Sequence, residues 1–235
     1  MIMKKILTIL TVLLMGNIGF TQNTKSVHLD GVDGYINVNN SSSLDLINSE
    51  FSIQFWYKCD VVTTTSTVNI IDNYGPTTSS NPNFWSLHIL GSSSGVNSGK
   101  ISYFVNSGGV GTGSIVSTNS IDDGVFHHID IERYSNGDVI MFIDGVLQGT
   151  TSTPLNTVMD NTEPIYIGSR HYSRFNNCEI NEVLITKENV YYNDFCPPVS
   201  FNTTINSVLH LNIEEGTGVV LNDLSTSGND GDLIG

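Results

Sequence analysis

The stretch Phe-His-His-Ile-Asp-Ile-Glu-Arg-Tyr-Ser-Asn-Gly-Asp-Val-Ile-Met-Phe-Ile-Asp-Gly-Val-Leu-Gln-Gly, residues 126–149, contains two turn signals between three short apolar runs. Asn136-Gly137 follows the first run, and Asp144-Gly145 separates the second from the third. Both dipeptides tolerate the positive φ angles that tight hairpin turns require. The stretch therefore predicts three consecutive antiparallel strands.

Alternation assigns the two faces of the first of these strands. Ile129 and Ile131 point one way, whereas His128, Asp130 and Glu132 point the other, because successive side chains of a strand alternate. We therefore expect one apolar and one polar face.

The same reading extends along the chain, which is rich in Ser, Thr, Asn and Gly and offers about a dozen short strands. Besides the opening stretch, we expect strands at 27–30, 35–38, 51–59, 63–72, 84–90, 100–105, 114–117, 164–168, 179–186 and 208–213. Surface loops rich in Gly and Ser are expected at 91–99 and 107–113, and a single helical turn at 187–193. This pattern predicts an all-β protein, a β-sandwich or barrel.

Residues 1–22 have the pattern of a secretory signal peptide. Lys4 and Lys5 precede an apolar run from 6 to 15, and the small residues Gly16 and Gly19 follow. The run is short for a membrane span, which makes an uncleaved anchor the weaker alternative. We therefore predict a secreted protein, extracellular or at the cell surface, with no membrane insertion after cleavage.

The charge balance disfavours nucleic acid as a partner. The chain has nine basic and 23 acidic residues and a net charge of −14. Loss of the leader removes two basic residues and no acid, which moves the charge to about −16. Such a surface repels phosphate backbones and anionic lipids.

The three cysteines are Cys59, Cys178 and Cys196. Their spacing excludes a C-x-x-C centre, and an oxidising compartment permits one disulfide. Separation along the chain favours Cys178–Cys196. Cys59 would remain as a small buried apolar residue.

Six stretches, taken in order, resemble strands of the laminin-G-like, concanavalin-A-like jelly-roll superfamily of lectins and glucanases, in its bacterial secreted form. The stretch 126–133, for instance, is similar to the family's "trp-his-his-val-ala-val-thr-arg" strand, with Phe126 where Trp is usual. The others are 27–38, 51–58, 139–145, 165–169 and 175–186. The resemblance implies an antiparallel two-sheet β-sandwich over residues 23–200, but such a fold hosts many functions.

Residues 201–235 resemble the segment that normally opens such a domain. One interpretation is the start of a truncated second module. The other is a C-terminal strand and loop that close the same sandwich, which we favour because a lone strand without a partner sheet is unstable.

The polar face of the opening strand suggests catalysis, since laminarinase-type glycoside hydrolases of this superfamily carry Glu-x-Asp-x-Glu on one strand. Here His128 stands where the nucleophilic carboxylate is required, which leaves Asp130 and Glu132. A retaining mechanism needs two carboxylates about 5 Å apart in the right roles. We therefore predict a domain that is not an enzyme, with a glycoside hydrolase using Asp130 and Glu132 as the alternative.

The resemblance also implies a structural Ca²⁺ where the first and last strands of the domain meet. By position, Asp30 and Asn181 correspond to that site, and Asp223 in the C-terminal loop is a third candidate oxygen ligand. The alternative is that Asp30 and Asp223 only shape turns.

The leading functional prediction is a non-catalytic module that binds carbohydrate or an extracellular protein, in adhesion or glycan capture. A structural module of a surface assembly is a further alternative. Aromatic rings stack on the apolar faces of sugars while polar groups take the hydroxyls. The candidate ligand-binding residues are Trp56, Tyr74, Trp85, Arg170 and Tyr172.

Overall fold

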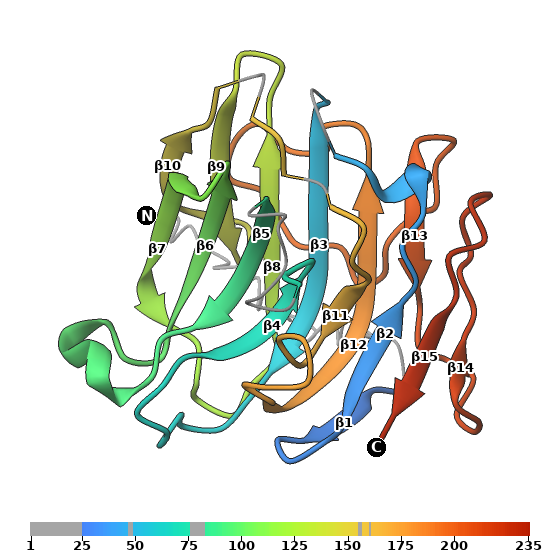
Figure 1. Ribbon diagram of the computed structural model, residues 1–235, viewed down its shortest axis with the longest axis horizontal. Coiled ribbons are helices and arrows are strands. Elements are labelled where there is room, and N and C mark those ends of the chain that lie inside the picture. Colours follow the sequence, from blue (N-terminus) through green and yellow to red (C-terminus); the bar gives the residue numbers. More distant parts are fainter. Residues whose placement is uncertain (1–24, 47–48, 76–82, 155–156, 160) are drawn as a thin grey trace, which may run out of the picture.

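The computed structural model describes residues 25–235 except 47–48, 76–82, 155–156 and 160. Two antiparallel sheets face each other (Figure 1), as the strand pattern predicts. The expected signal peptide at 1–22 lies outside the described residues. Within the described ranges, no helix is long and apolar enough to cross a membrane.

Sheet A has seven strands, and β12 lies at its branch point: β1 and β13 both pair with β12 on the side opposite β3. A bulge in β12 between Ile180 and Val183 separates the part that meets β1 from the part that meets β13. The strands, in spatial order, are β1 (Val27–Asp30), β12 (Asn177–Thr186), β3 (Phe51–Lys58), β8 (His127–Arg133), β9 (Asp138–Ile143) and β10 (Val146–Ser152), with β13 (Ser207–Leu211) beside β12.

Sheet B has eight strands. In spatial order they are β14 (Val220–Leu221), β15 (Gly231–Ile234), β2 (Tyr35–Val38), β11 (Ile165–Ile167), β4 (Val68–Asp72), β5 (Phe84–Ile89), β6 (Lys100–Ser107) and β7 (Val110–Ser120). Two 3-10 turns, η1 (Ser42–Leu44) and η2 (Ser92–Asn97), complete the regular structure.

The core lies between the sheets and is built by alternation. On β3, Phe51, Ile53 and Phe55 point inward, and on β8 Ile129 and Ile131 do the same. Sheet B contributes a matching set that includes Trp85, Leu87 and Tyr103. Full burial of each such side chain contributes about 1.5–3 kcal/mol.

The turns of residues 126–149 form as two different types. Asp144 and Gly145 both take positive φ angles, 52° and 74°, which is the two-residue hairpin that the sequence predicts. Gly137 closes a longer loop instead, since Tyr134 donates to the carbonyl of Asp138 and Gly137 donates to Tyr134.

Several segments differ from the sequence prediction, among them η2, a 3-10 turn within the expected loop 91–99. The expected loop 107–113 is a hairpin in which β6 and β7 pair on both sides of Gly108-Gly109, whose positive φ angles allow a tight turn. The expected helical turn at 187–193 is irregular.

The C-terminal segment adds strands to both sheets. β13 pairs with β12 in sheet A, and β15 pairs with β2 in sheet B. β14 and β15 were not among the predicted strands. This is the arrangement that closure of one sandwich requires.

Candidate functional site

The outer face of sheet B carries a group of partly exposed rings and cations. Strand register puts Tyr166, Asp72, Ser86 and Phe104 in one row across β11, β4, β5 and β6. Their side chains point away from the core, because the neighbours of each in its own strand point inward.

The loop 168–176 follows β11 and packs against β4 (Figure 1). Gly168 begins it with a φ of 86°, and a Cβ there would lie 2.1 Å from the Leu29 side chain. The N–H of Gly168 donates to Ile70 at 2.7 Å, and the carbonyl of Arg174 accepts from Asn69 at 3.1 Å. Both ends of the loop are therefore fixed to β4.

Three residues of this loop have strained backbone conformations. His171, Tyr172 and Arg174 have φ angles of 39°, 58° and 52°, in the left-handed region that costs a non-glycine residue about 1–2 kcal/mol. Arg170 and Ser173 exchange both backbone hydrogen bonds, at 2.7 and 3.0 Å, which holds the turn. Strain of this kind, maintained by surrounding contacts, is a feature of functional loops.

The turn places one arginine and one tyrosine on the outer face of the sheet. The Arg170 guanidinium lies 3.4 Å from the centre of the Tyr74 ring, a cation–π contact. The Tyr172 ring packs edge-on against Tyr35 and Tyr166 and remains 59% exposed.

Further rings continue this surface along β5 and β6. Phe84 meets Tyr74 edge-on at 4.5 Å, and Phe104 lies 5.8 Å beyond Phe84. We refer to the whole surface as the aromatic–arginine face. Its residues are Tyr74, Phe84, Phe104, Arg170, Tyr172 and Arg174.

A buried polar group lies beneath the aromatic–arginine face. Asp72 has no exposed surface; one of its oxygens accepts from the N–H of Tyr74 at 3.1 Å and the other accepts from the Asn69 amide. The same amide donates to Ser86 at 3.0 Å. Burial raises the pKa of Asp72 to about 8. Its hydrogen bond from the Tyr74 N–H fixes the backbone that carries the Tyr74 ring.

Three of the five predicted ligand-binding residues meet on this face: Tyr74, Arg170 and Tyr172. The other two do not. Trp85 points into the core and is 1% exposed, so no ligand can reach it. Trp56 lies on the outer face of sheet A, packed against His128 at 5.3 Å.

Sequence reasoning missed Phe84, Phe104 and Arg174. Alternation groups Phe84 with Ser86 and His88, and the opposite face of the strand with Trp85, Leu87 and Ile89. The wholly apolar second set could have identified the core side, which would have excluded Trp85 and selected Phe84.

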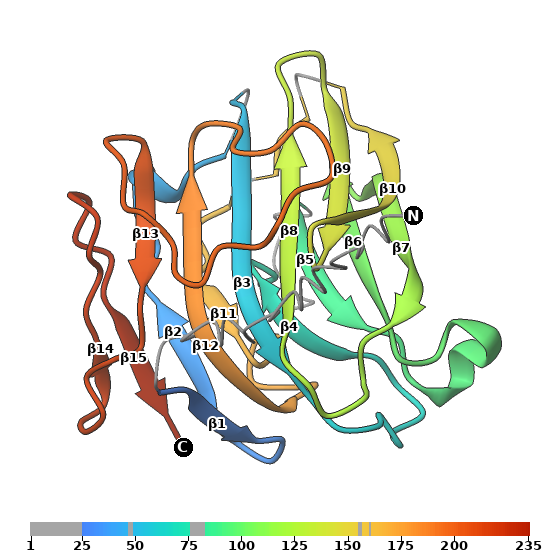
Figure 2. The same cartoon turned by 180° about the vertical axis from the view of Figure 1, so that it is seen from behind.

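β8, the strand that would carry catalysis in the glycoside hydrolase alternative, is covered. The segment 187–206 crosses the outer face of sheet A over β3 and β8 (Figure 2). His128, Asp130 and Glu132 have no exposed surface. They do share the outer face, as alternation predicts, but no substrate can reach them while the segment lies there.

Glu132 fixes this covering segment to the sheet. Its carboxylate accepts from the N–H of Val190 at 3.1 Å, the N–H of Tyr191 at 3.0 Å and the Asn189 amide at 2.9 Å. His128 lies among the rings of Trp56, Phe195 and Phe201, and burial lowers its pKa to about 4, which keeps it neutral. The contacts of His128 and Glu132 are those of structural residues.

The predicted calcium ligands do not form one site. Asp30 pairs with Asn177, whereas Asn181 donates its amide to Lys25, five residues before Asp30. At about 3.3 Å per residue this separation exceeds what one Ca²⁺, with oxygens at about 2.4 Å, can bridge. Among the described residues, no cluster of three His, Cys, Asp or Glu side chains is placed to hold a metal.

Asp30 and Asp223 instead shape turns. One oxygen of Asp30 accepts from the N–H groups of Val32, Asp33 and Gly34. Asp223 accepts from the backbone of His210 and from donors within its own loop. The residue set proposed for Ca²⁺ therefore does not fit an ion, and the turn interpretation describes these two residues.

The predicted disulfide is not formed. Cys178 lies on the core side of β12 and is buried, whereas Cys196 is exposed on the segment that covers the opposite face of the same sheet. Cys59 is also buried, and desolvation raises its pKa to about 12. Separation along the chain could not show that β12 would lie between Cys178 and Cys196.

We expect one reactive thiol in the folded protein. Ellman's reagent should titrate Cys196 alone under native conditions and all three cysteines in guanidinium chloride, because thiolates form and react only where solvent reaches them. A Cys196→Ser variant, as the control, should show none in the folded state. A Cys178–Cys196 disulfide would give a single thiol after denaturation, and that result would contradict the structure.

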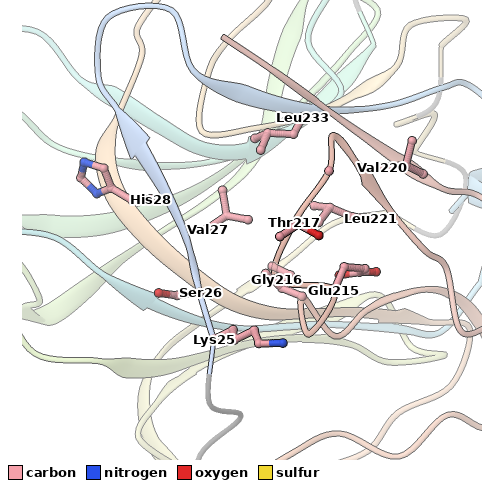
Figure 3. Close-up of a pocket in the computed structure, with 12 residues that line it drawn as sticks. Lys25, Ser26, Val27, His28, Glu215, Gly216, Thr217, Val220, Leu221 and Leu233 are labelled. Carbon is pink, nitrogen blue, oxygen red and sulfur yellow. The ribbon is translucent and has the colours of Figure 1, made fainter.

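A hollow lies at the edge of the sandwich between β1, β14 and β15. Figure 3 shows Lys25 and Val27 on one side of it and Glu215 and Thr217 on the other. Its volume is about 250 Å³. Lys25 donates to the carbonyl of Glu214 at 2.6 Å. No Trp, Tyr or Phe belongs to the residues that line it, which makes it the weaker candidate for a sugar.

Comparison with known proteins assigns the family. Residues 30–189 match the sequence profile of Laminin_G_3, described as the concanavalin A-like lectin/glucanases superfamily. The chain belongs to this superfamily. A comparison with curated protein sequences finds no match.

Solved structures with the superfamily fold include several binding proteins. A Bacteroides ovatus protein described as a "putative carbohydrate binding protein" has a TM-score of 0.68 at 15% identity, over 91% of this chain and 59% of that one. The binding domain of Paraclostridial Mosquitocidal Protein 1 has a TM-score of 0.51 at 15% identity, over 72% and 44%. The Ruminococcus gnavus IT-sialidase CBM40 has a TM-score of 0.50 at 9% identity, over 71% and 92%.

At these identities the likeness is one of fold. The chain spans less than two thirds of the first two of these structures. The residues that would carry a function have to be found on this chain itself.

Proposed function

We propose that the protein is a secreted or cell-surface module that binds carbohydrate through the aromatic–arginine face, for adhesion or glycan capture. The observation that carries this proposal is the loop 168–176. It holds Tyr172 in a strained conformation in which the residue is 59% exposed, and it places the Arg170 guanidinium on the Tyr74 ring. Exposure of an aromatic ring to water is unfavourable in free energy, and exposed rings are typical of binding surfaces.

The chemistry of this face suits a sugar. The apolar face of a pyranose can stack on the Tyr172 ring, while the five N–H donors of Arg170 can bind hydroxyl oxygens. Arg170 keeps its position without a ligand because it lies on Tyr74, so less conformational freedom is lost on binding.

The comparisons support a binding role. Two of the similar structures are described as a carbohydrate-binding protein and as a CBM40 of a sialidase. The alternative of a glycoside hydrolase gains no support, since Asp130 and Glu132 are buried and hydrogen-bonded to the protein itself.

The test is a glycan array followed by calorimetry with the bound sugars. Tyr172→Ala should weaken binding at least tenfold, which corresponds to about 1.4 kcal/mol and to an aromatic anchor at a binding site. Tyr192→Ala is the matched control: this tyrosine is 63% exposed, but it belongs to the segment over sheet A, and its loss should change affinity less than twofold.

Three results would count against the proposal. If Tyr172→Ala bound as tightly as the wild type, the ligand would lie elsewhere. If no glycan were bound and a pull-down captured an extracellular protein through this face, the protein-binding alternative would replace it, and an empty result in both would favour a structural module.

A further inference from the structure

We infer that the aromatic–arginine face selects glycans that carry an anionic group, a carboxylate or a sulfate, and that Arg170 and Arg174 hold this group. The inference rests on the proposed carbohydrate binding and adds the chemical class of the sugar. It is carried by the placement of the two arginines, by the charges around them and by the exposed Tyr172 on the same face.

The distribution of arginine in the chain is uneven. The sequence contains three arginines among nine basic residues, against 23 acidic residues. Arg133 is buried, and its guanidinium donates to Ser49, Thr153 and Pro154. The other two, Arg170 and Arg174, lie four residues apart in the strained loop 168–176. An acidic protein therefore places both of its remaining arginines on one surface.

Neither of these arginines is neutralised by direct contact with an acid. Within the described part of the chain, the ion pairs involve Lys58, His127 and His210, and none involves Arg170 or Arg174. Arg170 lies on the Tyr74 ring, and Arg174 donates to the Thr67 hydroxyl.

Both carboxylate oxygens of the nearby buried acid, Asp72, already accept hydrogen bonds from groups other than the arginines. Its two oxygens accept from the Tyr74 N–H and the Asn69 amide. Burial also raises the pKa of Asp72 to about 8, which reduces the negative charge under the arginines at neutral pH.

The two guanidinium groups are close enough to repel each other. Partial burial, and after it the charge of Arg170, lowers the pKa of Arg174. Burial and then both arginines lower the pKa of His88 to about 4, so this neighbour remains uncharged. A bound anion would relieve the repulsion, and carboxylate and sulfate oxygens match the planar fork of arginine, which can bind them through two parallel hydrogen bonds.

The neighbouring ring makes the ligand a sugar rather than a free ion. Tyr172 lies between Arg170 and Arg174 in the sequence, and its ring faces solvent. A glycan stacked on Tyr172 would lie on the same outer face of sheet B that carries Arg170 and Arg174.

The experiment uses a glycan array that pairs neutral oligosaccharides with counterparts that differ by a carboxylate or by a sulfate. We expect the anionic members to bind at least tenfold more tightly than their neutral counterparts. The carboxylated and sulfated sets distinguish the two sources of the charge. Binding of the anionic members should weaken at least tenfold between 50 and 500 mM NaCl, because salt screens charge interactions.

Charge-matched variants locate the effect. Arg170→Gln and Arg174→Gln should each weaken the binding of anionic members at least tenfold more than the binding of their neutral counterparts. Lys187→Gln changes the net charge equally but lies next to sheet A, and it should retain the preference. Circular dichroism of each variant checks that the fold is kept.

The possible failures are distinguishable. Neutral and anionic glycans bound with equal affinity would overturn this inference and leave the proposed function standing. A preference that survived in Arg170→Gln, Arg174→Gln and the double variant would also overturn it. Binding of no glycan at all would overturn the proposed function and the inference together.

Discussion

Replacement of Glu182 by alanine should lower the free energy of unfolding by about 2–6 kcal/mol, because it leaves two buried polar groups without their hydrogen-bond partner. Glu182 lies on β12 and is 1% exposed. One of its oxygens lies 2.8 Å from Nε2 of His210 on β13, and both accept from the N–H of Phe201 at 3.1 Å.

The loss would be large because Glu182 joins three parts of the fold. It connects β12 to β13, and it holds the end of the segment 187–206 at Phe201. The other nitrogen of His210 is already engaged, 2.6 Å from the Thr203 hydroxyl. Alanine at 182 therefore leaves a buried imidazole nitrogen and a buried N–H without partners, and such groups cost about 1–3 kcal/mol each.

Urea denaturation at pH 7 measures the effect, and Glu188→Ala is the matched control. Glu188 lies on the covering segment near Glu182 and binds Thr204 and Asn206, but in a solvent-exposed setting. Its loss should cost less than about 1 kcal/mol. A loss below 1 kcal/mol in Glu182→Ala as well would show that β13 and the segment are held by packing alone.

This anchoring explains why the two outer faces of the sandwich differ. The outward polar residues of sheet A make contacts within the protein. Glu132 and Glu182 accept hydrogen bonds from the backbone of the covering segment, and the rings of Phe195 and Phe201 cover His128. Sheet B carries the loop 168–176 instead, which leaves the Tyr172 ring in solvent. The polar strand that suggests chemistry in the sequence is therefore structural, and the binding candidate lies on the other sheet.

Local patterns were sufficient for the all-β class and for most of the strands, whereas the two-sheet sandwich was predicted from the family resemblance. The bounds of β1 and β2 agree with the predicted strands, because a turn that contains Gly and Asp separates the two apolar runs. The Asp144-Gly145 hairpin follows from backbone preference alone. β14 and β15 were missed because strands of two and four residues with few apolar side chains give almost no periodic signal.

The site was only partly predictable, because a strand pattern gives two faces without saying what covers each. Tyr74, Arg170 and Tyr172 were predicted as separate candidates, and only the fold of the loop brings them together. Phe84 and Trp85 are neighbours in sequence, but Trp85 lies in the core and Phe84 on the outer face, because only one side of β5 meets sheet A. His128, Asp130 and Glu132 share a face as predicted, but nothing local indicates that a segment some 60 residues later covers them.

The stability of Glu132→Gln relative to the wild type should increase by about 2–3 kcal/mol between pH 5 and pH 8. Burial raises the pKa of Glu132 to about 7, against the three hydrogen bonds from the covering segment that favour the carboxylate. Burial, and after it the charge of Glu132, raises the pKa of Asp130 in the same direction. These two groups therefore bind protons more tightly in the folded state than in the unfolded state.

The sign of the effect follows from this difference. Below about pH 4.5, the ordinary value for Glu, both states hold the proton and Glu132 contributes its full stability. As the pH rises toward 7 the unfolded state releases the proton first, so the wild type loses stability, at 1.36 kcal/mol for each unit of pKa difference. Glutamine cannot ionise and does not share that loss.

Urea denaturation of both proteins at several pH values gives the difference directly and cancels the titration of groups that the variant leaves unchanged. Glu188→Gln is the control, because hydrogen bonds from Thr204 and Asn206 lower the pKa of Glu188. Its stability contribution is present above pH 4.5 and lost only below that value, so its difference from the wild type should be flat between pH 5 and pH 8. An equally flat difference for Glu132→Gln would mean that the three donors outweigh burial and that Glu132 holds the segment as a carboxylate throughout this range.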